Sequence, residues 1–115
     1  MKILIIVNES PWGSSLGMTA LRLARVMVTG KARIAAVFFR EEGVYHAQPG
    51  RAVDGGTICL NGAWRDLSKQ AGAPLLVCSA AAQRRLKKAP QDGFREAGLA
   101  EILEIMARCD RVVTF

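Results

Sequence analysis

Residues 3–7 read Ile-Leu-Ile-Ile-Val, an unbroken aliphatic run. A second run, Ala-Ala-Val-Phe-Phe at residues 35–39, also lacks polar side chains. Strands buried on both faces of a parallel sheet have such continuous apolar runs, whereas strands with one exposed face alternate apolar and polar residues. The two runs therefore predict two interior strands of a parallel sheet.

Two shorter apolar runs predict further strands, and the segments between strands repeat apolar residues at helical spacing. Glycines follow the first two helical segments, at Gly30 and Gly72, and predict where those helices end. Strands that alternate with helices imply a parallel sheet with right-handed crossovers. The expected strands are residues 3–7, 35–39, 75–77 and 112–115, and the expected helices are residues 16–27, 60–71, 79–86 and 99–106.

Length and composition agree with this fold class. The chain has 115 residues, of which 50% are hydrophobic and 23% charged. This balance excludes intrinsic disorder, and the length predicts a single domain over residues 1–115. We expect an α/β fold: a small parallel sheet flanked by helices, of flavodoxin-like or Rossmann-like type. The N-terminal apolar run is too short for a secretory signal or a membrane span, which favours a cytoplasmic protein without membrane contact.

The chain is basic, with 16 Lys and Arg against 10 Asp and Glu and a net charge of +6. Proteins that bind single-stranded nucleic acid usually combine basic and aromatic residues, but aromatic residues make up only 6% here. No basic stretch contains one. The pattern therefore argues against direct nucleic-acid binding, and an acidic protein partner explains the charge equally well.

No metal or cofactor is expected. The three cysteines, Cys59, Cys78 and Cys109, are far apart in sequence, and the single histidine makes a zinc site improbable. Four residues near the N-terminus are weak candidates for a flavin-phosphate loop, because their spacing fits such a loop poorly. Those candidates are Asn8, Ser14, Ser15 and Gly17.

Cys78 has the most informative position of the three cysteines. It follows the expected strand 75–77 and precedes a helix-forming stretch. A thiol at the carboxyl end of a parallel strand and at a helix N-terminus lies where ligands collect and anions are stabilised. Cys78 is therefore expected to ionise most readily of the three thiols. The alternative is a structural cysteine packed as a small hydrophobe.

Cys78 and Arg84 also form a Cys-x5-Arg pattern, the spacing of the anion loops of tyrosine phosphatases and rhodaneses. Such loops usually need glycine for their positive φ angles. The intervening residues are Ser-Ala-Ala-Ala-Gln, which favour a helix. A phosphatase-like or rhodanese-like enzyme is therefore retained only as an alternative.

Three stretches together resemble the DsrE/TusD family of sulfur-relay proteins, particularly its TusD-like branch. Residues 37–47 (Val-Phe-Phe-Arg-Glu-Glu-Gly-Val-Tyr-His-Ala) are similar to the family's second strand and the loop after it. Residues 77–85 (Val-Cys-Ser-Ala-Ala-Ala-Gln-Arg-Arg) are similar to its active-cysteine segment. Residues 97–103 and 109–115 are similar to its C-terminal helix and strand.

The resemblance implies a sulfurtransferase that needs no cofactor. In it, Cys78 would accept a sulfane sulfur as a persulfide and pass it on, with sulfur-carrier proteins as donor and acceptor. Family members serve 2-thiouridine formation in tRNA or sulfur oxidation, and the resemblance implies a homo-oligomer or hetero-oligomer, a trimer or hexamer with related subunits. The rival expectation is a non-catalytic subunit of such an assembly with an inert Cys78.

The remaining candidates surround Cys78 in the expected fold. Tyr45 and His46 are expected after the second strand, where they line the cysteine pocket or face solvent. Ser79 is a further candidate for the pocket or for docking. Arg84 and Arg85 begin a basic cluster with Lys87 and Lys88, interpreted as a docking patch for an acidic carrier or tRNA, or as a solvated helix end.

Two further expectations concern structure. Cys59 and Cys109 are expected to be structural. An oligomer is expected because the final strand is apolar and because the chain has more large apolar side chains than one thin sheet layer needs. These side chains are Trp12, Trp64, Phe38 and Phe39.

Overall fold

The computed structural model describes residues 1–12, 15–48 and 60–115. Its five strands form one sheet in the order β4-β3-β2-β1-β5, and every neighbouring pair is parallel. This confirms the predicted fold class. In chain order the elements are β1 (Lys2–Val7), α1 (Leu16–Thr29), β2 (Arg33–Phe39), the 3₁₀ helix η1 (Glu41–Ala47), α2 (Leu60–Ala71), β3 (Leu75–Cys78), α3 (Ser79–Arg85), β4 (Phe94–Ala97), α4 (Leu99–Arg108) and β5 (Arg111–Thr114).

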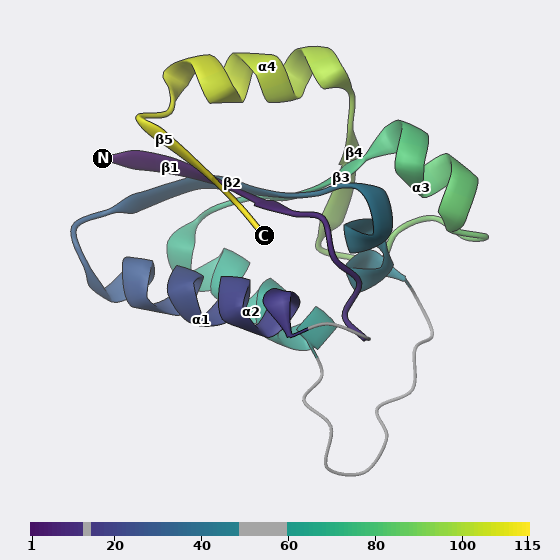
Figure 1. Cartoon of the computed structure of the whole chain (residues 1–115), viewed down its shortest axis with the longest axis horizontal. Helices are drawn as coiled ribbons and strands as arrows, with labels where there is room; N and C mark the ends of the chain where they lie inside the picture. The colour runs from purple at the N-terminus through teal and green to yellow at the C-terminus, as the bar shows by residue number, and fades with distance from the viewer. Residues whose placement is uncertain (13–14, 49–59) are drawn as a thin grey trace, which may run out of the picture.

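The helices cover the sheet on both faces. Helices α1 and α2 lie on one face and α4 on the other (Figure 1). Side chains of β1 alternate between the two resulting cores, with Ile3, Ile5 and Val7 toward α1 and Leu4 and Ile6 toward α4. Because both faces are covered, each interior strand needs apolar residues at successive positions. This is the physical reason for the unbroken run at the start of the sequence.

The predicted helix ends are confirmed. Gly30 caps α1, and its N–H donates to the Met27 carbonyl at 3.1 Å. Gly72 follows α2 with a φ of 65°, a left-handed conformation that glycine adopts without steric cost. The sequence therefore carries the stop signals of both helices.

The pattern analysis missed strand β4. Only its first and last residues, Phe94 and Ala97, are buried, while Arg95 and Glu96 are exposed. A four-residue edge strand with this burial shows neither a continuous apolar run nor an alternation. It forms because β3 offers a free edge, with Leu75 opposite Phe94 and Cys78 opposite Ala97.

Of the four large aromatic side chains from which an oligomer was predicted, three are buried and offer no surface to another subunit. Trp64 and Phe39 are fully buried and Phe38 is 7% exposed, so that argument was wrong for these residues. Trp12 is 40% exposed and packs against the Tyr45 ring, with ring centroids 5.2 Å apart. In the described part of the chain, no helix has the length and apolar character required to cross a membrane.

Candidate active site

Cys78 lies at the junction between β3 and α3. It is the last strand residue and the N-cap residue of the helix, in an extended conformation with φ of −60° and ψ of 117°. Its side chain is half-buried and packs against both cores. The expected position at the carboxyl edge of the sheet is confirmed. The side chain makes no capping hydrogen bond to α3, so its sulfur is not engaged as a helix cap.

The segment after Cys78 is helical from its first residue. Helix α3 runs from Ser79 to Arg85, with Ala81 and Ala82 buried. A helical backbone directs its N–H groups along the helix axis, whereas a phosphatase-type loop bends them around a bound anion. The alternative of a phosphatase-like loop between Cys78 and Arg84 is therefore wrong at the level of backbone geometry.

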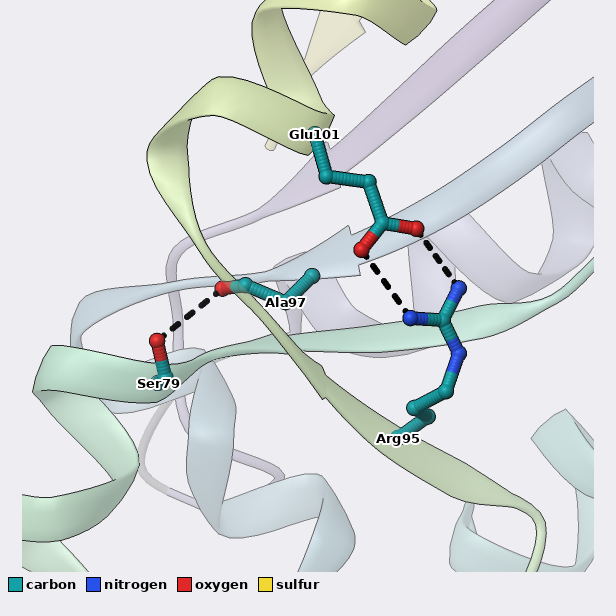
Figure 2. A network of polar contacts seen from close by, with 4 residues as sticks. All are labelled: Ser79, Arg95, Ala97 and Glu101. Carbon is teal, nitrogen blue, oxygen red and sulfur yellow. Dashed lines mark hydrogen bonds and ion pairs between the residues drawn. The ribbon is translucent and has the colours of Figure 1, made fainter.

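Strand β4 fixes the start of α3 (Figure 2). The Ser79 hydroxyl donates a hydrogen bond to the Ala97 carbonyl at 3.2 Å. Farther along, Arg95 donates two hydrogen bonds to the Glu101 carboxylate, at 3.0 and 2.7 Å, and so joins β4 to α4. These bonds lower the pKa of the Glu101 carboxyl and raise that of the Arg95 guanidinium. The Ser79 bond thus ties the first residue of α3, next to Cys78, to β4.

Tyr45 and His46 lie on η1, the 3₁₀ helix that follows β2. His46 is 1% exposed, so of the two alternatives expected for it, the one in which it faces solvent is wrong. Its Nε2 atom is 3.1 Å from the Glu9 carbonyl oxygen, and its ring packs against Phe39 with centroids 5.2 Å apart. Tyr45 is half-buried and packs against the same core and Trp12. Both residues therefore belong to a packed 3₁₀ helix that contacts α3, and not to an open loop.

Arg84 and Arg85 separate at the end of α3. Arg84 is exposed, while Arg85 is half-buried and lies 3.9 Å from the Glu41 carboxylate. Glu41 also lies 3.7 Å from Arg40 and has a φ of 51°, which is unusual for a residue other than glycine. The Arg85–Glu41 pair links α3 to η1. Arg84 remains available to a partner together with the exposed Lys87 and Lys88.

The other two cysteines have different surroundings. Cys109 is half-buried and packs against the core under α4. Burial is the main cause that raises the pKa of its thiol; Asp110 adds to this effect and Lys2 opposes it. At neutral pH Cys109 is therefore protonated and a poor nucleophile, in keeping with a structural role. Cys59 and Ser14 lie outside the described residues.

Sequence reasoning missed two residues that shape this edge. Gly43 lies where η1 passes over the end of β1, and a Cβ there would come within 2.0 Å of the Val7 carbonyl oxygen. Glu41 makes the ion pairs described above. The glycine at position 43 was the only sign in the sequence of a close contact there. The contact itself could not be predicted, because it is made with Val7, 36 positions away in the sequence.

Fold and site together define a class: a five-stranded parallel α/β protein with a half-buried cysteine between a strand and a helix. The chain belongs to the DsrE/DsrF-like family, whose model matches residues 1–115. It is similar to "Sulfurtransferase TusD" of Salmonella newport (strain SL254), with 34% identity over 128 residues and full coverage of both chains. It is also similar to "Sulfurtransferase TusD" of Sodalis glossinidius, with 32% identity over 124 residues, covering 96% of this chain and 95% of that protein.

Among solved structures, the chain resembles the ychN protein from E. coli. The TM-score is 0.85, the sequence identity is 21%, and the match covers 100% of this chain and 99% of the other. At this identity the likeness supports the fold alone.

Proposed function

We propose that this protein is a persulfide-carrying sulfurtransferase and that Cys78 is its catalytic residue. The observation that carries the proposal is the position of Cys78: half-buried, at the carboxyl edge of the sheet, and free of any capping bond that would occupy its sulfur. Full-length similarity to proteins named sulfurtransferase supports the same chemistry. We place the relay in the cytoplasm, because a working thiol of this kind requires a reducing compartment.

The transfer is a pair of thiol–disulfide-type exchanges. The Cys78 thiolate attacks the outer sulfur of a donor persulfide. A sulfur–sulfur bond forms to Cys78, the sulfur–sulfur bond of the donor breaks, and the donor leaves as a thiolate. An acceptor thiolate then attacks the outer sulfur on Cys78 and regenerates the Cys78 thiolate. Electrons balance without an added oxidant, and the step needs no metal or cofactor.

Loading with sulfur tests this proposal. After incubation with inorganic polysulfide and removal of excess reagent, the Cys59→Ser/Cys109→Ser variant should gain one sulfur atom by intact-mass spectrometry. The Cys78→Ser variant should gain none, because its hydroxyl is not a comparable nucleophile. Equal gains in Cys78→Ser and wild type would refute the proposal, and a wild type that gains nothing would favour a non-catalytic subunit.

We further propose that the carriers that exchange sulfur with Cys78 have an acidic docking surface. Arg84, near the end of α3, and Lys87 and Lys88, which follow this helix, are exposed. Seven helical residues span about 10 Å, slightly more than the Debye length of about 8 Å at physiological salt, so salt screens part of the field of these cations at Cys78. Arg85 is partly neutralised by Glu41. The relay itself is proposed to serve 2-thiouridine formation in tRNA rather than sulfur oxidation, in line with the TusD similarity.

The electrostatic effect of these cations at Cys78 can be tested by comparing an anionic and a cationic small thiol as sulfur acceptors. Two unit charges about 10 Å apart in water interact by about 0.4 kcal/mol before screening. Three cations acting on a dianion should therefore favour mercaptosuccinate over cysteamine as acceptor by about fivefold after screening. Arg84→Gln/Lys87→Gln/Lys88→Gln should remove this preference, as should high salt. The control Arg22→Gln/Arg25→Gln, on exposed α1 positions, should retain it; an unchanged preference in the triple variant would contradict the proposal.

We also propose that the protein works as a trimer or hexamer, with copies of itself or with related subunits. The supporting observation is apolar exposure on α4 and β5: Leu99 is 73%, Leu103 54% and Val112 41% exposed. Light scattering at micromolar concentration should give a mass of at least three times 12.4 kDa for the protein alone or with its partner subunits. A monomer under both conditions would contradict the proposal.

A further inference from the structure

A second feature lies at the opposite, amino edge of the sheet. A hollow of about 480 Å³ opens there between the starts of two central strands and the ends of two helices. Small-molecule sites usually have volumes of about 300–1,000 Å³. The hollow is therefore large enough for a compact ligand. Its lining residues are Lys2, Arg33, Ile34, Ala35, Ala71, Gly72, Ile105 and Arg108.

The charged residues that line this hollow are all basic. Lys2, Arg33 and Arg108 come from β1, β2 and α4, and no acidic residue is among the lining residues. None of the three takes part in the ion pairs found among the described residues. Three cationic residues from three separate elements thus line one concavity, and no carboxylate is among its lining residues.

Two nearby features oppose this positive charge, and neither cancels it. Helices α2 and α4 point their C-terminal ends toward the hollow, and each end is equivalent to about half a negative charge. The two ends together offset about one of the three cations. The carboxylate of Asp110 accepts a hydrogen bond from the backbone N–H of Lys2 at 2.7 Å. A net positive charge remains in the hollow itself.

The backbone that carries these cations is held in place. The Arg33 N–H donates to the Met1 carbonyl at 2.8 Å, and the Asp110 N–H donates to the Lys2 carbonyl at 2.8 Å. The starts of β1, β2 and β5 are thereby tied together, so the backbone that carries Lys2 and Arg33 is held by hydrogen bonds. Apolar side chains, Ile34 and Ile105, form part of the wall between them.

We propose that this hollow binds a small phosphomonoester with an apolar or aromatic group, of the size of a mononucleotide. A phosphomonoester carries about −1.5 to −2 charges at neutral pH and offers three acceptor oxygens, which suit convergent Arg and Lys donors. The Ile and Ala wall would contact the rest of the ligand. Six strand residues separate the hollow from the carboxyl edge, about 20 Å, so the site is independent of sulfur chemistry at Cys78.

Titration of the full chain with AMP, adenosine and inorganic phosphate, followed by two-dimensional NMR, tests the site. AMP should shift amide signals of residues 33–35, 71–72 and 105–108 with a Kd at or below the millimolar range. Adenosine should bind at least 10-fold more weakly, because it lacks the phosphate. Lys2→Gln/Arg33→Gln/Arg108→Gln should weaken AMP binding at least 30-fold; these exposed positions tolerate substitution without loss of fold.

A matched control removes the same number of charges elsewhere. Arg22→Gln/Arg25→Gln/Lys87→Gln, all exposed positions, should bind AMP as wild type does, and so should Cys78→Ser. Equal affinity for adenosine and AMP, or unchanged AMP binding by the hollow variant, would overturn the proposal. So would inorganic phosphate binding as tightly as AMP, or an RNA duplex binding at these residues while AMP does not.

Discussion

Replacing Gly43 with alanine is expected to lower the free energy of unfolding by about 2–3 kcal/mol or more. The added Cβ would lie 2.0 Å from the Val7 carbonyl oxygen and 2.9 Å from its carbon. This carbonyl is the acceptor for the Arg40 N–H at 3.0 Å, so it cannot turn away without breaking a backbone hydrogen bond. Either β1 or η1 must shift, and η1 supports the wall beside α3.

Urea denaturation followed by circular dichroism measures this effect, with Gly30→Ala as the matched control. A Cβ on Gly30 would meet its nearest neighbours at 3.6 and 3.7 Å, which is ordinary van der Waals contact. We expect Gly30→Ala to change the free energy of unfolding by less than about 0.5 kcal/mol. Equal unfolding midpoints for Gly43→Ala and Gly30→Ala would show that η1 does not cross β1 as described.

Truncation of Trp64 to alanine is expected to cost about 3–5 kcal/mol of stability, because it empties a fully buried aromatic site. Trp64 is 0% exposed and meets Phe39 edge-on, with ring centroids 5.3 Å apart and planes at 84°. Its ring also lies edge-on to His46 at 6.3 Å. Since small proteins are stable by only about 5–15 kcal/mol, this variant should be partly unfolded near physiological temperature.

The Trp64→Phe variant separates the effect of ring packing on stability from the effect of the buried indole N–H. The indole Nε1 of Trp64 is buried and has no hydrogen-bond partner within the part of the chain that the structure describes. Phenylalanine keeps most of the ring contact and removes this unsatisfied donor, so the expected loss is below about 2 kcal/mol. Thermal unfolding of both variants checks the order of stability. A Trp64→Ala variant as stable as Trp64→Phe would contradict the packing described around Phe39.

Cys78 was found from sequence because a strand pattern ends and a helix pattern begins at that residue, which fixes its edge of the sheet. The roles of Ser79 and Arg85 were not found, since each depends on one distant partner, Ala97 or Glu41. For His46 the sequence left two alternatives open, the cysteine pocket or solvent, because it lies in a segment expected to be a loop after a strand. Its burial follows from packing against Phe39 and Trp64.

The sequence by itself determined the class of fold: the continuous apolar runs of β1 and β2, the helical periodicities and the glycine stops are local properties of the chain. Tertiary structure alone decided β4, whose Arg95 and Glu96 give no strand pattern until β3 offers a free edge. It also decided that Lys2, Arg33 and Arg108 line one hollow, whereas the helix that begins directly after Cys78 was already indicated by the local sequence. The physical reason is the separation in sequence between the interacting residues. Helical and strand periodicity depends on a few neighbouring residues, whereas strand pairing, close backbone contacts and the grouping of charged residues depend on segments that are distant in sequence.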